Sequence, residues 1–148
     1  IALRSIENFD LPVLVGIHLK NSGLLPSKEK IEDVIKKYKD NKWLGVIMAC
    51  ISPSAYENVI NSLKNLNLPY GFKLNAFENI PEDYTVADKD VWGDAGNPTT
   101  ILGINKDLNE ENFYKYAKKF MENGATILGG CCEIRPSHIN EISKLKNK

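Results

Sequence analysis

Apolar residues along the chain gather in short runs that alternate with amphipathic segments. Nearly continuous apolar runs of β-forming residues cover 11–19 and 44–50, as expected of strands that are buried on both faces. A third run, 70–77, alternates more, and a fourth, 126–130, is short and contains two glycines. We therefore expect four strands, and none of these runs approaches the ~20 apolar residues that a membrane helix needs.

Helices are expected between the strands, because apolar residues recur there at intervals of three and four. The segments concerned are residues 1–9, residues 27–38, the stretch that begins at Ser52-Pro53, the stretch from Asn109 to Gly124, and residues 136–145. Ser52 supplies an N-cap and Pro53 the first helical position. Asn123-Gly124 is typical of a helix end with a left-handed residue.

The order of the elements predicts an α/β fold with a parallel sheet, since apolar strands alternate with crossover helices. A closed (β/α)₈ TIM barrel needs ~250 residues, so four βα units after a helical tail fit the C-terminal half of such a barrel. We treat residues 1–148 as a single domain whose N-terminal half is absent. A doubly wound open sheet is the alternative. The long connection 78–108, with Tyr84 and Trp92, is expected to cover a site.

The composition narrows the choice of partners. Nineteen Lys and Arg residues balance nineteen Asp and Glu residues, so the formal net charge is zero, and no basic block occurs. A neutral surface holds neither nucleic acid nor an acidic membrane, and we expect neither as a partner. The first residues lack the pattern of a signal peptide, which favours a cytoplasmic protein.

Three cysteines carry the main chemical signal. Cys50 ends the second expected strand, and the adjacent Cys131 and Cys132 end the fourth. The carboxyl ends of parallel strands share one rim, so we expect the three thiols to meet there. Three soft ligands suggest zinc, and a Cys₃ set leaves the fourth tetrahedral position open, as in catalytic zinc sites.

Other interpretations stay open at this point. A free cysteine often fills a core position, which suits Cys50 alone, but neighbouring residues at a strand end cannot both point into one core. A redox role needs a bridge from Cys50 to Cys131 or Cys132, because adjacent cysteines form only a strained disulfide and no CxxC motif is present. His18 and His138 are expected to be structural rather than ligands.

The segment 124–139, GATILGGCCEIRPSHI, resembles the C-terminal signature of the homocysteine S-methyltransferase family. That signature is G-A-x-I-x-G-G-C-C followed by P-x-H-I. The strand YGFKLNAF, which contains Asn75, and the run CISP that begins at Cys50 are similar to two further segments of the family. The resemblance implies a zinc enzyme on a (β/α)₈ barrel, with Cys50, Cys131 and Cys132 as the zinc ligands.

The resemblance also implies a reaction. We expect a methyl group to pass from a sulfonium, quaternary ammonium or folate donor to the thiol of homocysteine, giving methionine. Zinc would bind the substrate sulfur as a thiolate in its open position. Asn75 is expected to contact the substrate on the same rim.

The sequence departs from the family at some points. Ala49 stands where the family commonly has Asn before the first cysteine, and Glu133 stands where Gly or Arg commonly follows the pair. The family's Asp-Gly-Gly segment is absent. The alternatives are therefore a non-catalytic zinc-binding half-barrel, which pairs with a separate N-terminal half or with further copies of itself, and a thiol-redox protein.

Overall fold

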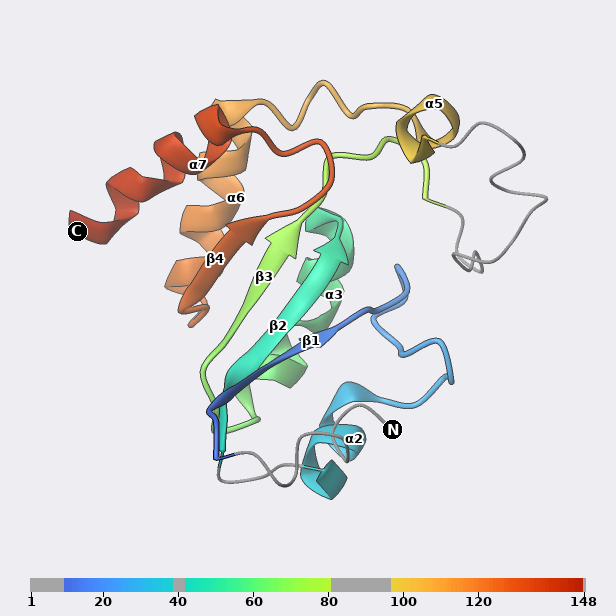
Figure 1. The fold of residues 1–148 in the computed structure, drawn as a ribbon, viewed down its shortest axis with the longest axis vertical. Coiled ribbons are helices and arrows are strands. Elements are labelled where there is room, and N and C mark those ends of the chain that lie inside the picture. Colours follow the sequence, from blue (N-terminus) through green and yellow to red (C-terminus); the bar gives the residue numbers. More distant parts are fainter. Residues whose placement is uncertain (1–9, 39–41, 81–96, 148) are drawn as a thin grey trace.

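The computed structural model describes residues 10–38, 42–80 and 97–147 (Figure 1). The expected helix at 1–9 lies outside these residues, as do Tyr84 and Trp92. The elements in chain order are β1 (Val13–Ile17), α2 (Ile31–Tyr38), β2 (Trp43–Ile51), α3 (Pro53–Lys64), β3 (Tyr70–Leu74), α5 (Pro98–Leu102), α6 (Glu110–Glu122), β4 (Ile127–Gly130), α7 (Pro136–Ser143) and the 3₁₀ turn η1 (Lys144–Asn147).

The four strands form one sheet in the order β1-β2-β3-β4, and every pair is parallel. The crossovers contain α2, then α3, then α5 and α6. This confirms the predicted α/β fold with four parallel strands. The arrangement is consistent with half of a (β/α)₈ barrel.

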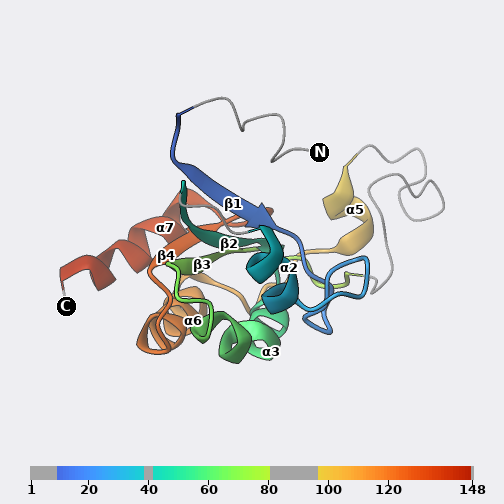
Figure 2. The same ribbon diagram turned by 90° about the horizontal axis from the view of Figure 1, so that it is seen from below.

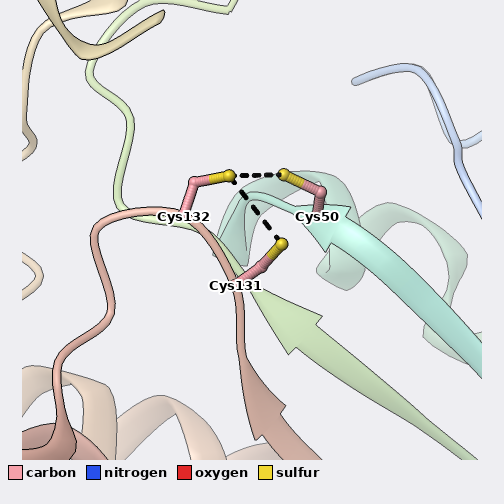
Figure 3. Close-up of side chains that lie close together, drawn as sticks. All are labelled: Cys50, Cys131 and Cys132. Atoms are coloured by element: carbon pink, nitrogen blue, oxygen red, sulfur yellow. Dashed lines mark hydrogen bonds between the residues drawn. The ribbon is translucent and has the colours of Figure 1, made fainter. Parts of the chain in front are cut away.

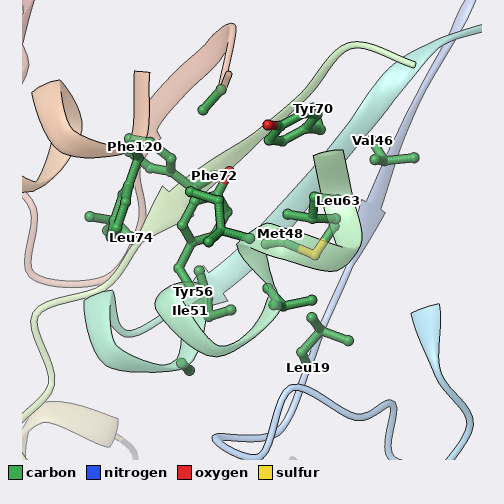
Figure 4. Close-up of a cluster of buried hydrophobic side chains, with 14 of the residues drawn as sticks. Leu19, Val46, Met48, Ile51, Tyr56, Leu63, Tyr70, Phe72, Leu74 and Phe120 are labelled. Carbon is green, nitrogen blue, oxygen red and sulfur yellow. The ribbon is translucent and has the colours of Figure 1, made fainter. Parts of the chain in front are cut away.

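Helices α3 and α6 lie on the same side of the sheet (Figure 2). Between them and the strands, Tyr56 of α3 meets Phe72 of β3 edge-on, with ring centroids 5.2 Å apart. Phe120 of α6 lies 4.6 Å from the same tyrosine ring. These rings belong to the buried cluster in Figure 4. The core therefore lies between the sheet and this helical layer.

The second face of the sheet is more open. Along β3, the side chains of Tyr70, Phe72 and Leu74 are buried, whereas Lys73 between them is exposed. The prediction that the first strand is buried on both faces was wrong, because Leu14 of β1 is 47% exposed. None of the described helices packs over this face of β1 (Figure 2).

Helix ends follow the predicted caps. The Ser52 hydroxyl accepts a hydrogen bond from the Ala55 N–H at 3.2 Å, and the Asn109 side chain accepts one from the Asn112 N–H at 3.0 Å. Gly124 has a φ of 100°, the left-handed residue expected after α6. The cap at Ser52 matters for the site, since it starts α3 directly after the end of β2.

Several elements differ from the sequence prediction. β1 is shorter than the predicted 11–19, and α7 ends at Ser143 rather than at 145. α2 begins at Ile31, later than expected, because Lys28 has a φ of 68° and cannot belong to a helix. β3 ends at Leu74, and Phe77 instead makes an antiparallel bridge with Ile104. The helix α5 was not predicted. Among the described helices, none is long and apolar enough to cross a membrane.

Candidate metal centre

Cys50 lies at a bulge between β2 and β3. Ala49 pairs with Lys73 and Ile51 pairs with Leu74, so Cys50 is an extra residue in the ladder. Its φ is 52°, in the left-handed region that residues with a Cβ seldom adopt. The bulge returns Ile51 to the core and turns Cys50 toward the rim.

Asn75, directly after β3, supports this bulge. Its side-chain amide donates to the Cys50 carbonyl at 2.7 Å and lies 3.7 Å from the Cys50 Sγ. Its Oδ1 accepts from the Phe77 N–H at 3.2 Å, and its own N–H donates to the Ile51 carbonyl at 2.9 Å. Asn75 is 1% exposed and acts here on Cys50. Its contact with substrate stays a prediction.

Cys131 and Cys132 follow β4 directly. The Cys131 N–H donates to the Leu74 carbonyl at 2.7 Å and so extends the β3–β4 ladder by one bond. The Ala76 N–H donates to the Cys132 carbonyl at 3.0 Å. A tight turn is closed by the Ile134 N–H, which donates to the Cys131 carbonyl at 3.1 Å. These bonds fix both cysteines beside the end of β3.

The three sulfurs converge (Figure 3). The Sγ of Cys132 lies 3.6 Å from that of Cys50 and 3.9 Å from that of Cys131, and all three lie within 4.8 Å of one another. No pair is bonded, since a disulfide has an S–S length of ~2.05 Å. The thiols therefore meet, as their positions at the strand ends predict.

The spacing of the sulfurs fits a tetrahedral zinc ion. Ligands at the Zn–S distance of ~2.3 Å stand ~3.8 Å apart around a tetrahedral centre. Two of the three sulfur separations, 3.6 and 3.9 Å, bracket that value, and the separation between Cys50 and Cys131 is within 4.8 Å. Thiolates are also the soft ligands that zinc favours. The donor set thus fits zinc, although metal binding by the cysteines stays a prediction.

Burial also affects the protonation of the cluster. Burial raises the pKa of the Cys50 thiol to about 12, and the sulfurs of Cys131 and Cys132 add to the shift. Burial also raises the pKa of the Cys132 thiol above its ordinary value. These two thiols are therefore protonated at neutral pH unless a nearby cation stabilises the thiolates.

The two histidines have other partners. Nδ1 of the buried His138 accepts from the Arg135 N–H at 3.2 Å, so Nε2 carries the proton and donates to the Leu108 carbonyl at 3.0 Å. His138 ties α7 to the loop before α6, as its position predicts. His18 lies nearer the rim, with Nδ1 3.4 Å from the Ala49 carbonyl.

One contact of the cysteine turn was missed in the sequence. The hydroxyl of Thr99, in α5, donates a hydrogen bond to the carboxylate of Glu133. The available signal was Asn97-Pro98, a pair typical of a helix start, and Asn97 does cap the Thr99 N–H at 3.1 Å. This pair could have marked the start of a short helix, but no local pattern indicates the contact with Glu133.

A cavity of about 760 Å³ lies apart from the cysteines. It is bounded by the start of α3, the chain after β3 and the face of α6, including Ser52, Phe77 and Lys115. None of the three cysteines lines it. The thiol cluster is therefore a site on the rim and not the floor of this cavity.

Fold and site together define an α/β protein of half-barrel form with a three-thiol cluster at the carboxyl ends of parallel strands. The profile described as Homocysteine S-methyltransferase matches residues 1–145. The chain belongs to the homocysteine S-methyltransferase family, which confirms the resemblance seen in the sequence.

The sequence identity between this chain and individual relatives is below 30%. Homocysteine S-methyltransferase 1 of Saccharomyces cerevisiae is 28% identical over 143 residues, which cover 93% of this chain and 40% of the relative. Homocysteine S-methyltransferase 2 of the same yeast is 29% identical over 159 residues, which cover 99% of this chain and 44% of the relative. Selenocysteine methyltransferase of Astragalus bisulcatus is 26% identical over 140 residues, which cover 94% of this chain and 37% of the relative. The chain spans about two fifths of the length of these relatives.

Proposed function

We propose that this chain is the zinc-binding part of an enzyme that transfers a methyl group to the thiol of homocysteine, giving methionine. Cys50, Cys131 and Cys132 would be the ligands. The observation that carries the proposal is the spacing of their sulfurs, which suits three corners of a zinc tetrahedron. Family membership supplies the reaction class.

Zinc, when bound, would hold the substrate sulfur as a thiolate at neutral pH. The residues of the chain have distinct tasks around it. Asn75 holds the bulge that aims Cys50, and the backbone bonds after β4 aim the vicinal pair. Cys132 is exposed, so the cluster can be approached from solvent. The substrate sulfur supplies the electron pair of the new S–CH₃ bond, and the donor keeps the pair of the bond that breaks.

The proposal includes completion of the barrel. The open second face of the sheet, with Leu14 exposed, suits cover by further strands. We propose that the N-terminal half of the barrel provides them, in the same chain, in a separate chain, or through further copies of this one. A cytoplasmic location and the absence of nucleic acid as a partner belong to the same proposal.

A non-catalytic zinc-binding module is the second candidate. It is favoured by the thiol cluster itself, because three converging cysteines can hold zinc without any methyl transfer. A module of this kind would hold zinc with the same cysteines but would not catalyse methyl transfer, even with the rest of the barrel supplied.

Metal content tests the first step. The purified chain should hold one zinc, and Cys50→Ser, Cys131→Ser and Cys132→Ser should each lower its occupancy strongly. His138→Gln, a substitution at a residue with other partners, is the control and should keep the metal. A chain without zinc whose Cys50 and Cys132 instead cycle between thiol and disulfide would support the redox alternative and refute the proposal.

Methyl transfer tests the second step. The chain would be assayed with homocysteine and with S-methylmethionine, S-adenosylmethionine, betaine or methyltetrahydrofolate, with and without an N-terminal half taken from a relative. Methionine formation that needs the cysteines supports the enzyme. Zinc binding without methionine formation in the completed barrel supports the module. Because one relative is named a selenocysteine methyltransferase, selenocysteine is the competing acceptor to include.

A further inference from the structure

Glu133 combines an unfavourable backbone with a long-range contact. It follows Cys132 directly and has a φ of 61°, a conformation that favours glycine and is costly for a residue with a Cβ. It is the third residue of the turn that the Ile134 N–H closes on the Cys131 carbonyl. Its carboxylate accepts the hydrogen bond from the Thr99 hydroxyl. The side chain therefore makes a contact that glycine would lack.

Thr99 belongs to an element that is itself anchored. α5 ends at Leu102, whose side chain is 2% exposed. The Leu102 carbonyl accepts a hydrogen bond from the Asn79 N–H at 2.9 Å. The Asn105 N–H then donates to the Ala76 carbonyl at 2.9 Å. α5 is thus fixed to the chain after β3, and Glu133 bonds to a fixed point.

The side chain of Cys132 is the least supported of the three. Asn75 holds Cys50, and a ladder bond holds Cys131 at the end of β4. The bond from the Ala76 N–H holds the carbonyl of Cys132 but does not fix the direction of its side chain. Cys132 is the exposed member, yet its sulfur is the one within 4 Å of both others. Its direction depends on the turn that it shares with Glu133.

We propose that Glu133 is a positioning residue for the metal centre: its hydrogen bond with Thr99 holds the turn in the conformation that aims Cys132 at the other two sulfurs. The proposal rests on the proposed function, since it assigns the bond a role in metal binding. The hydrogen bond, and not the negative charge of Glu133, is the active feature.

The test measures Co²⁺ affinity and the thiolate-to-cobalt absorption of the metal-free chain. Thr99→Val and Glu133→Ala should each weaken binding by about tenfold or more, the usual effect of removing an outer partner of a metal ligand. Thr99→Ser and Glu133→Gln keep a donor and an acceptor, so they should bind within about twofold of the unchanged chain. Ser27→Ala removes a similar hydroxyl-to-carboxylate bond, to Glu29, and serves as the control.

Glu133→Gly separates the backbone from the side chain. Glycine is favoured at positive φ, so this variant should unfold at the same or a higher temperature and still bind Co²⁺ more weakly. The double variant Thr99→Val with Glu133→Ala should bind no more weakly than either single variant, because both remove one bond. Unchanged affinity in Thr99→Val, or Glu133→Gln as weak as Glu133→Ala, would overturn the proposal.

Failure of the proposed function gives a different result. If the unchanged chain binds no Co²⁺, the metal centre is refuted, and the positioning role is decided by oxidation of the metal-free chain with diamide, which accepts the two electrons of the Cys50 and Cys132 thiols. Thr99→Val should then form this disulfide more slowly than Thr99→Ser. Equal rates would overturn the positioning role as well.

Discussion

Each sulfur of the cluster depends on a different local structure. A bulge aims Cys50, a ladder bond holds Cys131, and a tight turn presents Cys132. Two of these structures place a residue with a Cβ at positive φ, namely Cys50 and Glu133. Strained backbone of this kind is retained where other interactions enforce it, and it concentrates at functional sites.

The raised pKa values of Cys50 and Cys132 predict a steep pH dependence of metal affinity. Both thiols carry protons through the neutral range and must release them to bind, so affinity rises with pH. We expect the Co²⁺ affinity of the metal-free chain to rise by about two powers of ten or more per pH unit between about pH 6.5 and 7.5. Competition with a chelator measures it.

Removing one of the thiols provides the control for this pH series. Cys50→Ser should reduce the slope by about one power of ten per pH unit, because one proton fewer is released. An affinity that does not change with pH in the unchanged chain would contradict metal binding by these thiols.

Two buried tyrosines of the core should respond oppositely to loss of the hydroxyl. The Tyr56 hydroxyl has no hydrogen-bond partner among the described residues, so Tyr56→Phe should raise the free energy of unfolding by about 1 kcal/mol. The Tyr70 hydroxyl donates to the Asn123 carbonyl at 2.6 Å, and Tyr70→Phe should lower that free energy by about 1 kcal/mol. Urea unfolding of both variants checks this; a loss of stability in Tyr56→Phe would contradict it.

At the scale of elements, local patterns predicted the strands and the long helices. Apolar runs marked β1 to β4, and Ser52 and Asn109 marked the starts of α3 and α6. The exposed side of β1 was missed, because an apolar run reports the side chains but not what covers them. α5 was missed because five residues are too few to show helical periodicity.

The candidate site was predicted in outline only. Strand ends place Cys50, Cys131 and Cys132 on one rim, and this needs only the parallel order of the strands. The bulge at Cys50 depends on Asn75, which follows β3, and the contact between Thr99 and Glu133 joins distant segments. Neither has a local pattern, so the sequence could not show them.

The cap of α7 gives a prediction at this scale. Both ring nitrogens of His138 are hydrogen-bonded to backbone, so His138→Ala should lower the free energy of unfolding by about 2 kcal/mol, because one buried and one partly buried backbone group lose their partner. Zinc content should not change. His18→Ala, at an exposed residue, is the control. Loss of zinc in folded His138→Ala would show that the ring has a part in metal binding.

At the scale of the whole molecule, the two faces of the sheet differ in cover. The helix side is packed by α3 and α6, while Leu14 on the other side is 47% exposed (Figure 2). A parallel sheet is normally covered on both faces. The open face is therefore the part of the molecule that a completed barrel would bury.

The same substitution on the two faces tests this difference. Leu74→Ala, at a fully buried position, should lower the free energy of unfolding by about 3 kcal/mol, whereas Leu14→Ala should lower it by less than about 1 kcal/mol. When an N-terminal half is supplied, Leu14→Ala should become costly. Equal losses in the isolated chain would show that the Leu14 face is already covered, for instance by association of chains.

X-ray absorption at the zinc edge tests the central claim most directly. The zinc-loaded chain should show three sulfurs at ~2.3 Å, and the count should rise to four when homocysteine is added. A count of two sulfurs or fewer, or a count of three that homocysteine leaves unchanged in the completed barrel, would contradict a three-cysteine centre with one position kept for the substrate thiol.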